Sequence, residues 1–339
     1  MKDLDWSNLS FGYRQTDYNV RCYYRDGKWG EIEVCSDEYL KLHMAATCLH
    51  YGQEAFEGLK DYRCPDGKVR VFRMDENAKR LQSTCRGILM PEVPTEMFEE
   101  MVKKVVRLNQ EWIPTYESGA TLYIRPLLIG TSAQVGVHPS KEYCFLIFVT
   151  PVGPYFKGGA KPITIRVSDF DRAAPHGTGH VKAGLNYAMS LHAIVTAHKE
   201  GFDENMYLDP ATRTKVEETG GANFIFITKD GKLVTPKSDS ILPSITRRSL
   251  MYIAEHYLGM KVEHREVYFD EVKDFAEAGL CGTAAVISPI GKIVDHGKEI
   301  LIPSGMEEMG PVTKKLYDTL TGIQMGRIEA PEGWIKRIL

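Results

Sequence analysis

Short stretches in the first 73 residues are rich in hydrophobic and β-branched positions and are separated by turn residues, which is the pattern of β-strands. Residues 20–24 and 29–34 flank an Asp-Gly pair at Asp26 and Gly27. An Asp-Gly pair between two such stretches is typical of a β-hairpin. A second Asp-Gly pair, Asp66 and Gly67, precedes the stretch 69–72. The pattern predicts short strands joined by hairpin turns.

The hydrophobic period then changes to that of amphipathic helices. Residues 77–89 carry their apolar side chains on one stripe, and residues 95–112 do the same, with Thr95 as the expected N-cap. Residues 120–125 and 143–150 again favour strands. The apolar run at 144–149 is far too short to span a bilayer and is expected to be a buried strand.

Residues 151–162 are rich in proline and glycine and lie near the middle of the chain, which favours a domain boundary. We therefore predict an N-terminal domain at 1–150, a linker at 151–162 and a C-terminal domain at 163–339; the candidate residues below make the first the substrate-side domain and the second the cofactor-binding domain. The second half has the pattern of strands and helices that follows: 163–167 (strand), 185–199 (helix), 223–228 and 232–235 (a hairpin) and 245–258 (helix). The fold class predicted is α+β in two domains.

The composition narrows the class of protein. The chain has 339 residues and a formal net charge of −3, which gives no support to binding of nucleic acid or of a membrane surface. Its first residues contain no apolar signal segment, so a cytoplasmic protein is expected. The seven cysteines include no Cys-x-x-Cys pair, and His176 and His180 flank a turn, so neither a disulfide framework nor a metal site is predicted.

Lys182 is the candidate for covalent chemistry. It stands between a glycine-containing turn, Gly177-Thr-Gly179, and an apolar helix expected to begin near Leu185. A buried lysine loses its proton more readily and then acts as an amine nucleophile toward an aldehyde. Glycines allow the backbone to approach a flat, phosphate-bearing ligand closely. Tyr187 is close enough along the chain to hydrogen-bond the same ligand.

A pyridoxal phosphate site needs three further kinds of group, and each has candidates. Glu218 is the candidate for a carboxylate at the ring nitrogen, with Glu217 as its competitor. Ser244 is expected to cap a helix whose first amides, those of Ile245 and Thr246, form an anion site. Thr283 offers a hydroxyl in a turn. Arg80 offers a fixed cation for phosphate, although Lys79 and Arg73 are alternatives.

Aromatic and basic residues of the first half are candidates for the substrate side. Tyr51 and Phe56 surround a turn, and Tyr123 and Arg125 share one face of a predicted strand. An arginine beside a tyrosine is a candidate receptor for a carboxylate. Tyr155 in the predicted linker completes the set, although core packing is the more common role of each aromatic taken singly.

These segments together resemble the branched-chain amino acid aminotransferases, which belong to the fold-type IV group of pyridoxal phosphate enzymes. The resemblance covers about residues 50–285 and is carried, in family order, by the segments 50–60, 77–81, 122–126, 182–187, 218–223, 242–247 and 282–284. It implies a two-domain fold with a smaller N-terminal α/β domain and a larger C-terminal domain that contains a mixed, barrel-like sheet. It also implies a homodimer in which some first-domain residues reach the neighbour's pocket.

The resemblance implies a role for each site residue. Lys182 is the Schiff-base lysine, Tyr187 bonds the ring hydroxyl, and Glu218 rather than Glu217 lies at the ring nitrogen, five residues before Asn223. The phosphate is held by Arg80, Ile245, Thr246 and Thr283. The substrate is surrounded by Tyr51, Phe56, Tyr123, Arg125, Tyr155, Gly221 and Ala284. The implied reaction is a ping-pong transfer of the amino group between leucine, isoleucine or valine and 2-oxoglutarate.

Three other functions are weighed against this one. A D-amino acid aminotransferase or an aminodeoxychorismate lyase shares the fold group, but the His50-Tyr-Gly and Tyr123-x-Arg125 pieces and the length of the first domain argue against both. A nucleotide-binding loop at 177–182 lacks the Gly-Lys-Ser/Thr spacing. A catalytically silent interaction module is disfavoured by the intact set of Lys182, Glu218 and Arg80.

Overall fold

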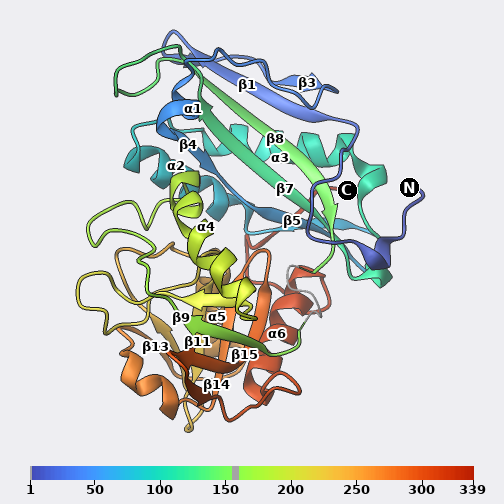
Figure 1. The fold of residues 1–339 in the computed structure, drawn as a ribbon. Coiled ribbons are helices and arrows are strands. Elements are labelled where there is room, and N and C mark those ends of the chain that lie inside the picture. The colour runs from blue at the N-terminus through green and yellow to red at the C-terminus, as the bar shows by residue number, and fades with distance from the viewer. Residues whose placement is uncertain (1, 155–159) are drawn as a thin grey trace. The chain divides into compact units, whose positions relative to one another are not determined.

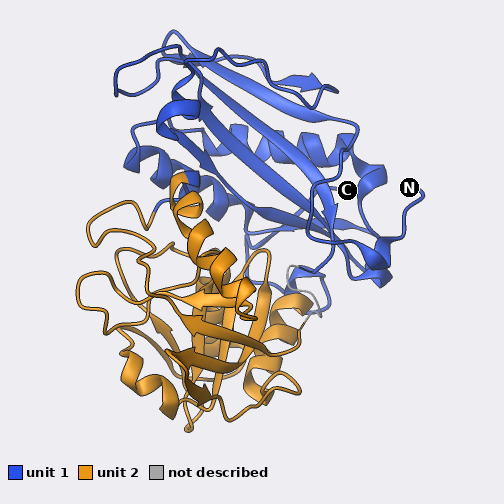
Figure 2. Ribbon diagram, in the orientation of Figure 1, with its two compact units in different colours: residues 1–154, 181–184, 323–339 blue, residues 155–180, 185–322 orange. Residues whose placement is uncertain are grey.

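The computed structural model describes residues 2–154 and 160–339, which form two compact units (Figures 1 and 2). Unit 1 comprises Met1–Pro154, Val181–Gly184 and Ile323–Leu339, and unit 2 comprises Tyr155–His180 and Leu185–Gly322. Neither unit is continuous in sequence, since the segment that carries Lys182 and the C-terminal segment both group with unit 1. The predicted linker includes residues 155–159, which lie outside the described residues, and the predicted domain limits stay a prediction.

Unit 1 is built on an antiparallel sheet that has nine strands among the described residues. Its order is β17 (Ile335–Arg337), β6 (Val69–Phe72), β5 (Leu59–Arg63), β7 (Thr121–Gly130), β8 (Tyr143–Val152), β1 (Asn19–Arg25) and β2 (Lys28–Trp29). In addition, β3 (Glu33–Cys35) pairs with β1 and β4 (Glu54–Phe56) pairs with β7. The hairpins predicted at the two Asp-Gly pairs are present as β1–β2 and β5–β6.

The two faces of this sheet have different partners because successive side chains of a strand point to opposite sides. On β8, Phe145 and Ile147 pack in the main core with α2 (Met74–Gly87) and α3 (Thr95–Leu108). Leu146 lies on the other face, in a smaller cluster with Cys144 and Ile129. Figure 1 shows α2 and α3 on one side of the sheet. The short helix α1 (Thr47–Tyr51) and the 3-10 turns Trp6–Asn8, Gln110–Trp112 and Tyr116–Ser118 complete the unit.

The predicted helix 77–89 is observed as Met74–Gly87, and the limits of α3 also differ from the prediction. Thr95 is the first residue of α3 rather than its N-cap, and Pro94 takes the cap position without a side-chain hydrogen bond. The helix ends at Leu108, since the side chain of Asn109 bonds other backbone groups: its amide donates to the Tyr18 carbonyl and its oxygen accepts from the Tyr18 amide. Such side-chain bonds to the backbone compete with helix continuation.

Unit 2 contains the predicted mixed sheet, with eight strands among the described residues. Its order is β10 (Glu204–Met206), β9 (Ile163–Val167), β15 (Val286–Asp295), β14 (Glu277–Gly282), β11 (Asn223–Ile227), β12 (Leu233–Pro236) and β13 (Val262–Arg265), with β16 (Lys298–Leu301) on β15. The pairs β9–β10, β9–β15 and β12–β13 are parallel, and the others are antiparallel. The helices are α4 (Gly184–Lys199), α5 (Ile245–His256) and α6 (Pro311–Gln324), and Phe269–Asp274 forms a 3-10 turn.

All seven cysteines are free, and five of them are buried. Within the described part of the chain, no helix has both the length and the apolar character that crossing a membrane requires.

Asp61 on β5 is an anomaly in the core of unit 1. It pairs in register with Leu122 of β7 and with Val71 of β6, so its side chain points to the face that carries the main core. The residue is fully buried, and neither carboxyl oxygen has a hydrogen-bond partner among the described residues. Burial raises the pKa of Asp61 well above its usual value, and the charge of Arg63 opposes this only in part. We infer that Asp61 is protonated in the folded protein near neutral pH.

This protonation gives the fold a dependence on pH that Asp61→Asn should remove. Because the folded state holds a proton that the unfolded chain has lost, wild-type stability falls as pH rises above the ordinary carboxyl pKa, by at most about 1.4 kcal/mol per pH unit. Urea unfolding between pH 5 and 9 measures this. The free energy of unfolding of Asp61→Asn, relative to that of wild type, should increase as pH rises. Asp66→Asn, an exposed control, should show no such gain. A difference between Asp61→Asn and wild type that is independent of pH would contradict a neutral Asp61.

Candidate active site

The backbone of Lys182 is held by two hydrogen bonds inside unit 1. Its amide donates to Oγ1 of Thr84 at 3.0 Å, and its carbonyl accepts from the amide of Phe56 at 3.1 Å. Thr84 belongs to α2 and Phe56 ends β4. The lysine that follows the glycine turn in sequence is therefore fixed between a helix and a strand that lie about a hundred residues earlier in the chain.

The surroundings of the Lys182 amine raise the share of its neutral form. Burial lowers its pKa to about 8, and the charge of Arg80 contributes in the same direction, while Glu57 opposes it. At pH 7 a group with this pKa is neutral in about one molecule in ten, against about one in three thousand for an ordinary lysine. The predicted nucleophile is therefore much better populated here than on the surface of a protein.

Phe56 links Lys182 to the predicted carboxylate receptor. Lys182 Nζ lies 4.6 Å from the centre of the Phe56 ring, and the guanidinium carbon of Arg125 lies 4.8 Å from it. Arg125 Nη2 also donates to the hydroxyl of Tyr123 at 3.2 Å. Phe56, Tyr123 and Arg125 thus lie on the face of the unit 1 sheet opposite the main core, and the amine of Lys182 lies against the Phe56 ring.

Lys60 also points to that face, and no sequence motif singles it out; it is buried, whereas Lys182 is partly buried. It pairs in register with Tyr123, so the two side chains point the same way. Burial lowers its pKa to about 8 as well. Lys60 therefore competes with Lys182 on basicity alone, and the contact of Lys182 with Phe56 together with its proximity to Arg80 distinguishes the two.

Arg80 is buried and bound to a partner that no sequence pattern indicated. Its Nε and Nη2 donate to the two carboxylate oxygens of Glu57 at 2.8 and 2.7 Å. Glu57 is fully buried and also accepts from the side-chain amide of Asn77 at 2.8 Å. A side-on pair of this kind fixes the plane of the guanidinium. The two alternatives have other partners: Lys79 pairs with Asp75 and Glu76, and Arg73 pairs with Glu76 at 4.0 Å and lies over Trp334.

In unit 2, Glu218 is a buried carboxylate with a fixed orientation. One oxygen pairs with Arg172 Nη2 at 2.8 Å and accepts from the Leu242 amide at 3.1 Å, and the other accepts from the side-chain amide of Asn223. Burial raises the pKa of Glu218 to about 7 despite the opposing charge of Arg172. Its competitor Glu217 points elsewhere, to the hydroxyls of Ser238 and Ser240.

The other predicted residues of unit 2 lie at the same end of its sheet as Glu218. Asn223 at the start of β11 is opposite Cys281 of β14, so Gly221 lies next to the turn that carries Thr283 and Ala284. Leu242 connects Glu218 to the start of α5, where Ser244 is the predicted N-cap and accepts from the Arg247 amide at 3.0 Å. Ile245 and Thr246 are the first residues of α5, and both are buried. The first amides of a helix have no acceptor within the helix and are available to an anion.

Arg172 connects several segments at the end of the unit 2 sheet that carries Glu218. No sequence pattern indicated this residue. Besides Glu218, it donates to the carbonyls of Gly179 at 2.7 Å and Ser240 at 2.5 Å. A Cβ on Gly179 would overlap the Ser240 carbonyl and the Arg172 guanidinium. The lack of a side chain at Gly179 allows this packing within the protein, and the expectation that the glycines at 177–179 serve a ligand stays a prediction.

Three predicted residues have other placements. Tyr187 lies in the first turn of α4 and is partly buried. Tyr51 ends α1, and its hydroxyl donates to the carbonyl of Val135. Tyr155 lies outside the described residues. The contacts of Tyr51 thus connect it to the loop at Val135 and not to the group around Phe56.

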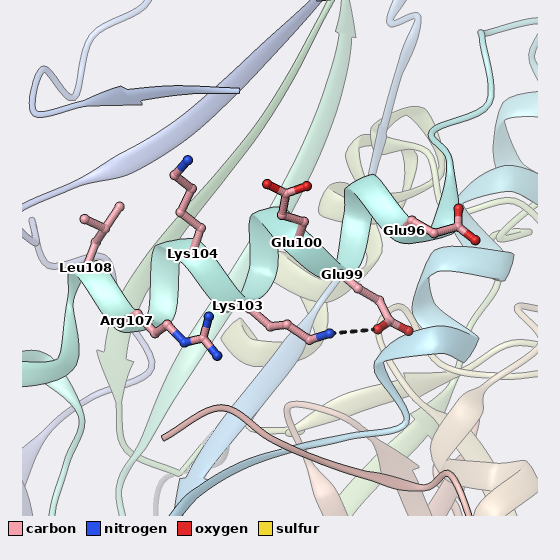
Figure 3. A pocket seen from close by; sticks show the side chains of 7 residues that line it. All are labelled: Glu96, Glu99, Glu100, Lys103, Lys104, Arg107 and Leu108. Carbon is pink, nitrogen blue, oxygen red and sulfur yellow. Dashed lines mark hydrogen bonds and ion pairs between the residues drawn. The ribbon is translucent and has the colours of Figure 1, made fainter. Parts of the chain in front are cut away.

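A hollow of about 660 Å³ along α3 is lined mainly by charged side chains and contains none of the predicted residues (Figure 3). Its lining is Glu96, Glu99, Glu100, Lys103, Lys104, Arg107 and Leu108. Glu99 and Lys103 pair at 3.2 Å, one helical turn apart. This is the solvated outer face of the helix, and we assign no site to it.

Comparison with known proteins decides the family. The model of the class IV aminotransferases matches residues 54–293, which contain every predicted site residue except Tyr51. The chain belongs to the class IV aminotransferases. The branched-chain-amino-acid aminotransferase of Haemophilus influenzae is 53% identical over the whole of both chains, and that of Helicobacter pylori is 49% identical over 99% of this chain and 98% of its own.

Solved structures agree with this membership. The crystal structure of the branched-chain amino acid aminotransferase of Escherichia coli has a TM-score of 0.81 and 29% identity, and it covers 96% of this chain and all of its own. The enzyme of Thermobaculum terrenum in its pyridoxal phosphate form has a TM-score of 0.79 and 26% identity, with 96% of this chain and 99% of that one covered. This aminotransferase therefore has the fold-type IV architecture that its sequence predicts.

The donor groups fit pyridoxal phosphate. Lys182 supplies an amine with a lowered pKa, Glu218 a buried carboxylate, and Arg80 with the start of α5 two kinds of anion donor. A carboxyl with a pKa of about 7 becomes fully ionised when a protonated ring nitrogen is placed beside it. The chemistry of these groups matches an aldehyde, a pyridine nitrogen and a phosphate.

A substitution at Gly58 tests whether Tyr123 contributes to substrate binding, because a Cβ at Gly58 would overlap the hydroxyl of Tyr123. Gly58→Ala should displace that hydroxyl and with it the contact to Arg125. We expect KM for the amino-acid substrate to rise roughly tenfold or more, since small misplacements of binding groups are costly, while affinity for pyridoxal phosphate changes little. Gly30→Ala is the control, because its Cβ would meet only the Tyr23 carbonyl at 3.4 Å. An unchanged KM in Gly58→Ala would show that Tyr123 does not contribute to substrate binding.

Proposed function

We propose that this enzyme is a branched-chain-amino-acid aminotransferase that uses pyridoxal 5′-phosphate. It transfers the amino group between L-leucine, L-isoleucine or L-valine and 2-oxoglutarate. The observation that carries the proposal is the desolvated amine of Lys182 beside Phe56, Arg80 and Arg125. The names of the relatives that match the full length of the chain support the choice of substrate.

The bound cofactor supplies an aldehyde and a ring that accepts an electron pair. Lys182 Nζ, neutral in about a tenth of molecules at pH 7, takes the proton from the α-carbon of the amino acid and later returns one. Glu218 would keep the ring nitrogen protonated, and Tyr187 would bond the ring hydroxyl. The phosphate would be held by Arg80, Ile245, Thr246 and Thr283. The 2-oxo acid leaves before 2-oxoglutarate binds, so both half-reactions use the same residues.

The substrate side of the proposal has an apolar and a charged part. Phe56 and Tyr123 offer aromatic surface to a branched side chain, and Arg125, which lies over both rings, offers a cation to a carboxylate. The full set proposed to surround the substrate is Tyr51, Phe56, Tyr123, Arg125, Tyr155, Gly221 and Ala284. The same arrangement accepts leucine and the acidic side chain of glutamate in turn.

A homodimer is part of the proposal. Met44, Leu49, Val135 and Val137 are each more than half exposed. They lie on neighbouring segments of unit 1, since the Gln134 amide donates to the Ala45 carbonyl at 3.0 Å. An apolar surface of this kind favours association of identical chains. The cytoplasm is the compartment proposed, because free, mostly buried thiols are typical of a reducing environment.

Spectroscopy with and without Lys182 tests the reaction. Wild-type protein with pyridoxal phosphate should show a visible absorption band that decreases on addition of L-leucine, with release of 4-methyl-2-oxopentanoate. In Lys182→Ala the release should be at least about a thousandfold slower, because the proton-transferring amine is gone. Lys199→Ala, at the exposed end of α4, should behave as wild type. A response to D-alanine but not to L-leucine would favour a D-amino acid aminotransferase instead.

Sedimentation tests the assembly. Wild type is expected at twice the mass of one chain, and the double variant Val135→Asp, Val137→Asp should shift toward a single chain, since charges on an apolar interface oppose association. Leu301→Asp, at an equally exposed apolar position of unit 2, is the control and should stay at the wild-type mass. A wild-type protein that sediments as one chain at micromolar concentration would contradict the homodimer.

A further inference from the structure

Glu57 is the most completely buried charged partner in unit 1. Its side chain has no solvent exposure, and that of Arg80 is 7% exposed. Both of its oxygens accept from Arg80, and one of them also accepts from Asn77 and, at 3.4 Å, from the Gly58 amide. A buried carboxylate is strongly disfavoured unless such donors surround it. Several hydrogen-bond donors therefore stabilise the one negative charge beside Arg80.

This ion pair belongs to the same hydrogen-bonded frame as Lys182. Phe56, the neighbour of Glu57, donates its amide to the Lys182 carbonyl, and Thr84, one helical turn after Arg80, accepts from the Lys182 amide. The backbone segments that carry the amine, the guanidinium and the carboxylate are thus linked to one another through α2 and β4. A change in the charge of Arg80 or Glu57 is therefore expected to change the electrostatic potential at the Lys182 amine.

We propose that Glu57 is a positioning residue that holds the guanidinium of Arg80 and partly neutralises its field at the Lys182 amine. The inference rests on the proposed function, since it concerns the residues assigned there to the aldehyde and the phosphate. Arg80 alone would bind a phosphate but would also weaken the lysine as a base. Glu57 restores part of that basicity while leaving a cation at the site.

The two partners have opposite effects on the pKa of Lys182. Arg80 lowers it and Glu57 raises it, in addition to the larger effect of burial. Glu57→Gln should therefore lower the pKa of the amine, Arg80→Gln should raise it, and the double variant should return close to wild type. If the role of Glu57 were purely structural, the two single variants would not shift the pKa of Lys182 in opposite directions.

The test measures how fast the full-length protein, freed of cofactor, reacts with pyridoxal at a series of pH values. Pyridoxal has the aldehyde but no phosphate, so it does not engage Arg80, and its own ionisation is common to all variants. Only the neutral amine reacts, so the midpoint of the rate profile follows the pKa of Lys182. We expect the midpoint to fall by about one pH unit in Glu57→Gln and to rise in Arg80→Gln.

Two controls define the outcome. Asp66→Asn removes a carboxylate from Arg70, which it binds through two hydrogen bonds at the surface of the same unit, and should leave the midpoint unchanged. Lys182→Ala should abolish the reaction, and a reaction that persists there would contradict the proposed function rather than the role of Glu57. With that control satisfied, a midpoint that is unchanged or raised in Glu57→Gln would overturn the inference. If Glu57→Gln does not fold, the difference between Arg80→Gln and the double variant reports the same effect.

Discussion

The structure of the site depends on the two hydrogen bonds that hold the backbone of Lys182 between Phe56 and Thr84. They place the amine of a segment near the middle of the chain against β4 and α2 of unit 1. Burial in that position lowers its pKa to about 8. Without this placement, the glycine-containing turn before Lys182 would present only an ordinary, protonated surface lysine.

Each of the two units contains a buried charged group that is paired with an opposite charge. A charged group assigned to the proposed site is buried, and a second, opposite charge keeps it in place: Glu57 for Arg80 in unit 1 and Arg172 for Glu218 in unit 2. Breaking such a buried pair by removing one partner is strongly destabilising, so the pairs also fix the local fold. Asp61 is the contrasting case: its buried carboxyl oxygens accept no hydrogen bond from the described residues, and burial raises its pKa well above the usual value.

Sequence patterns predicted the parts of the molecule that depend on local information. The bounds of β9, the hairpins at Asp-Gly pairs and the Ser244 cap are confirmed, because turn and cap chemistry acts within a few residues. The end of α3 was missed, since Asn109 bonds Tyr18, far away in sequence. Glu57, Thr84 and Arg172 were missed for the same reason: each acts on a residue between 23 and 98 positions away. The choice of Lys182 over Lys60 also required three-dimensional information, because both amines are buried.

That choice is the central claim, and one measurement tests it directly. The protein is incubated with pyridoxal phosphate, reduced with borohydride, digested and analysed by mass spectrometry to locate the lysine that carries the cofactor. We expect a single modified peptide, with the added mass on Lys182. Modification of Lys60, or of surface lysines without preference, would contradict the assignment of Lys182 as the lysine that binds the cofactor.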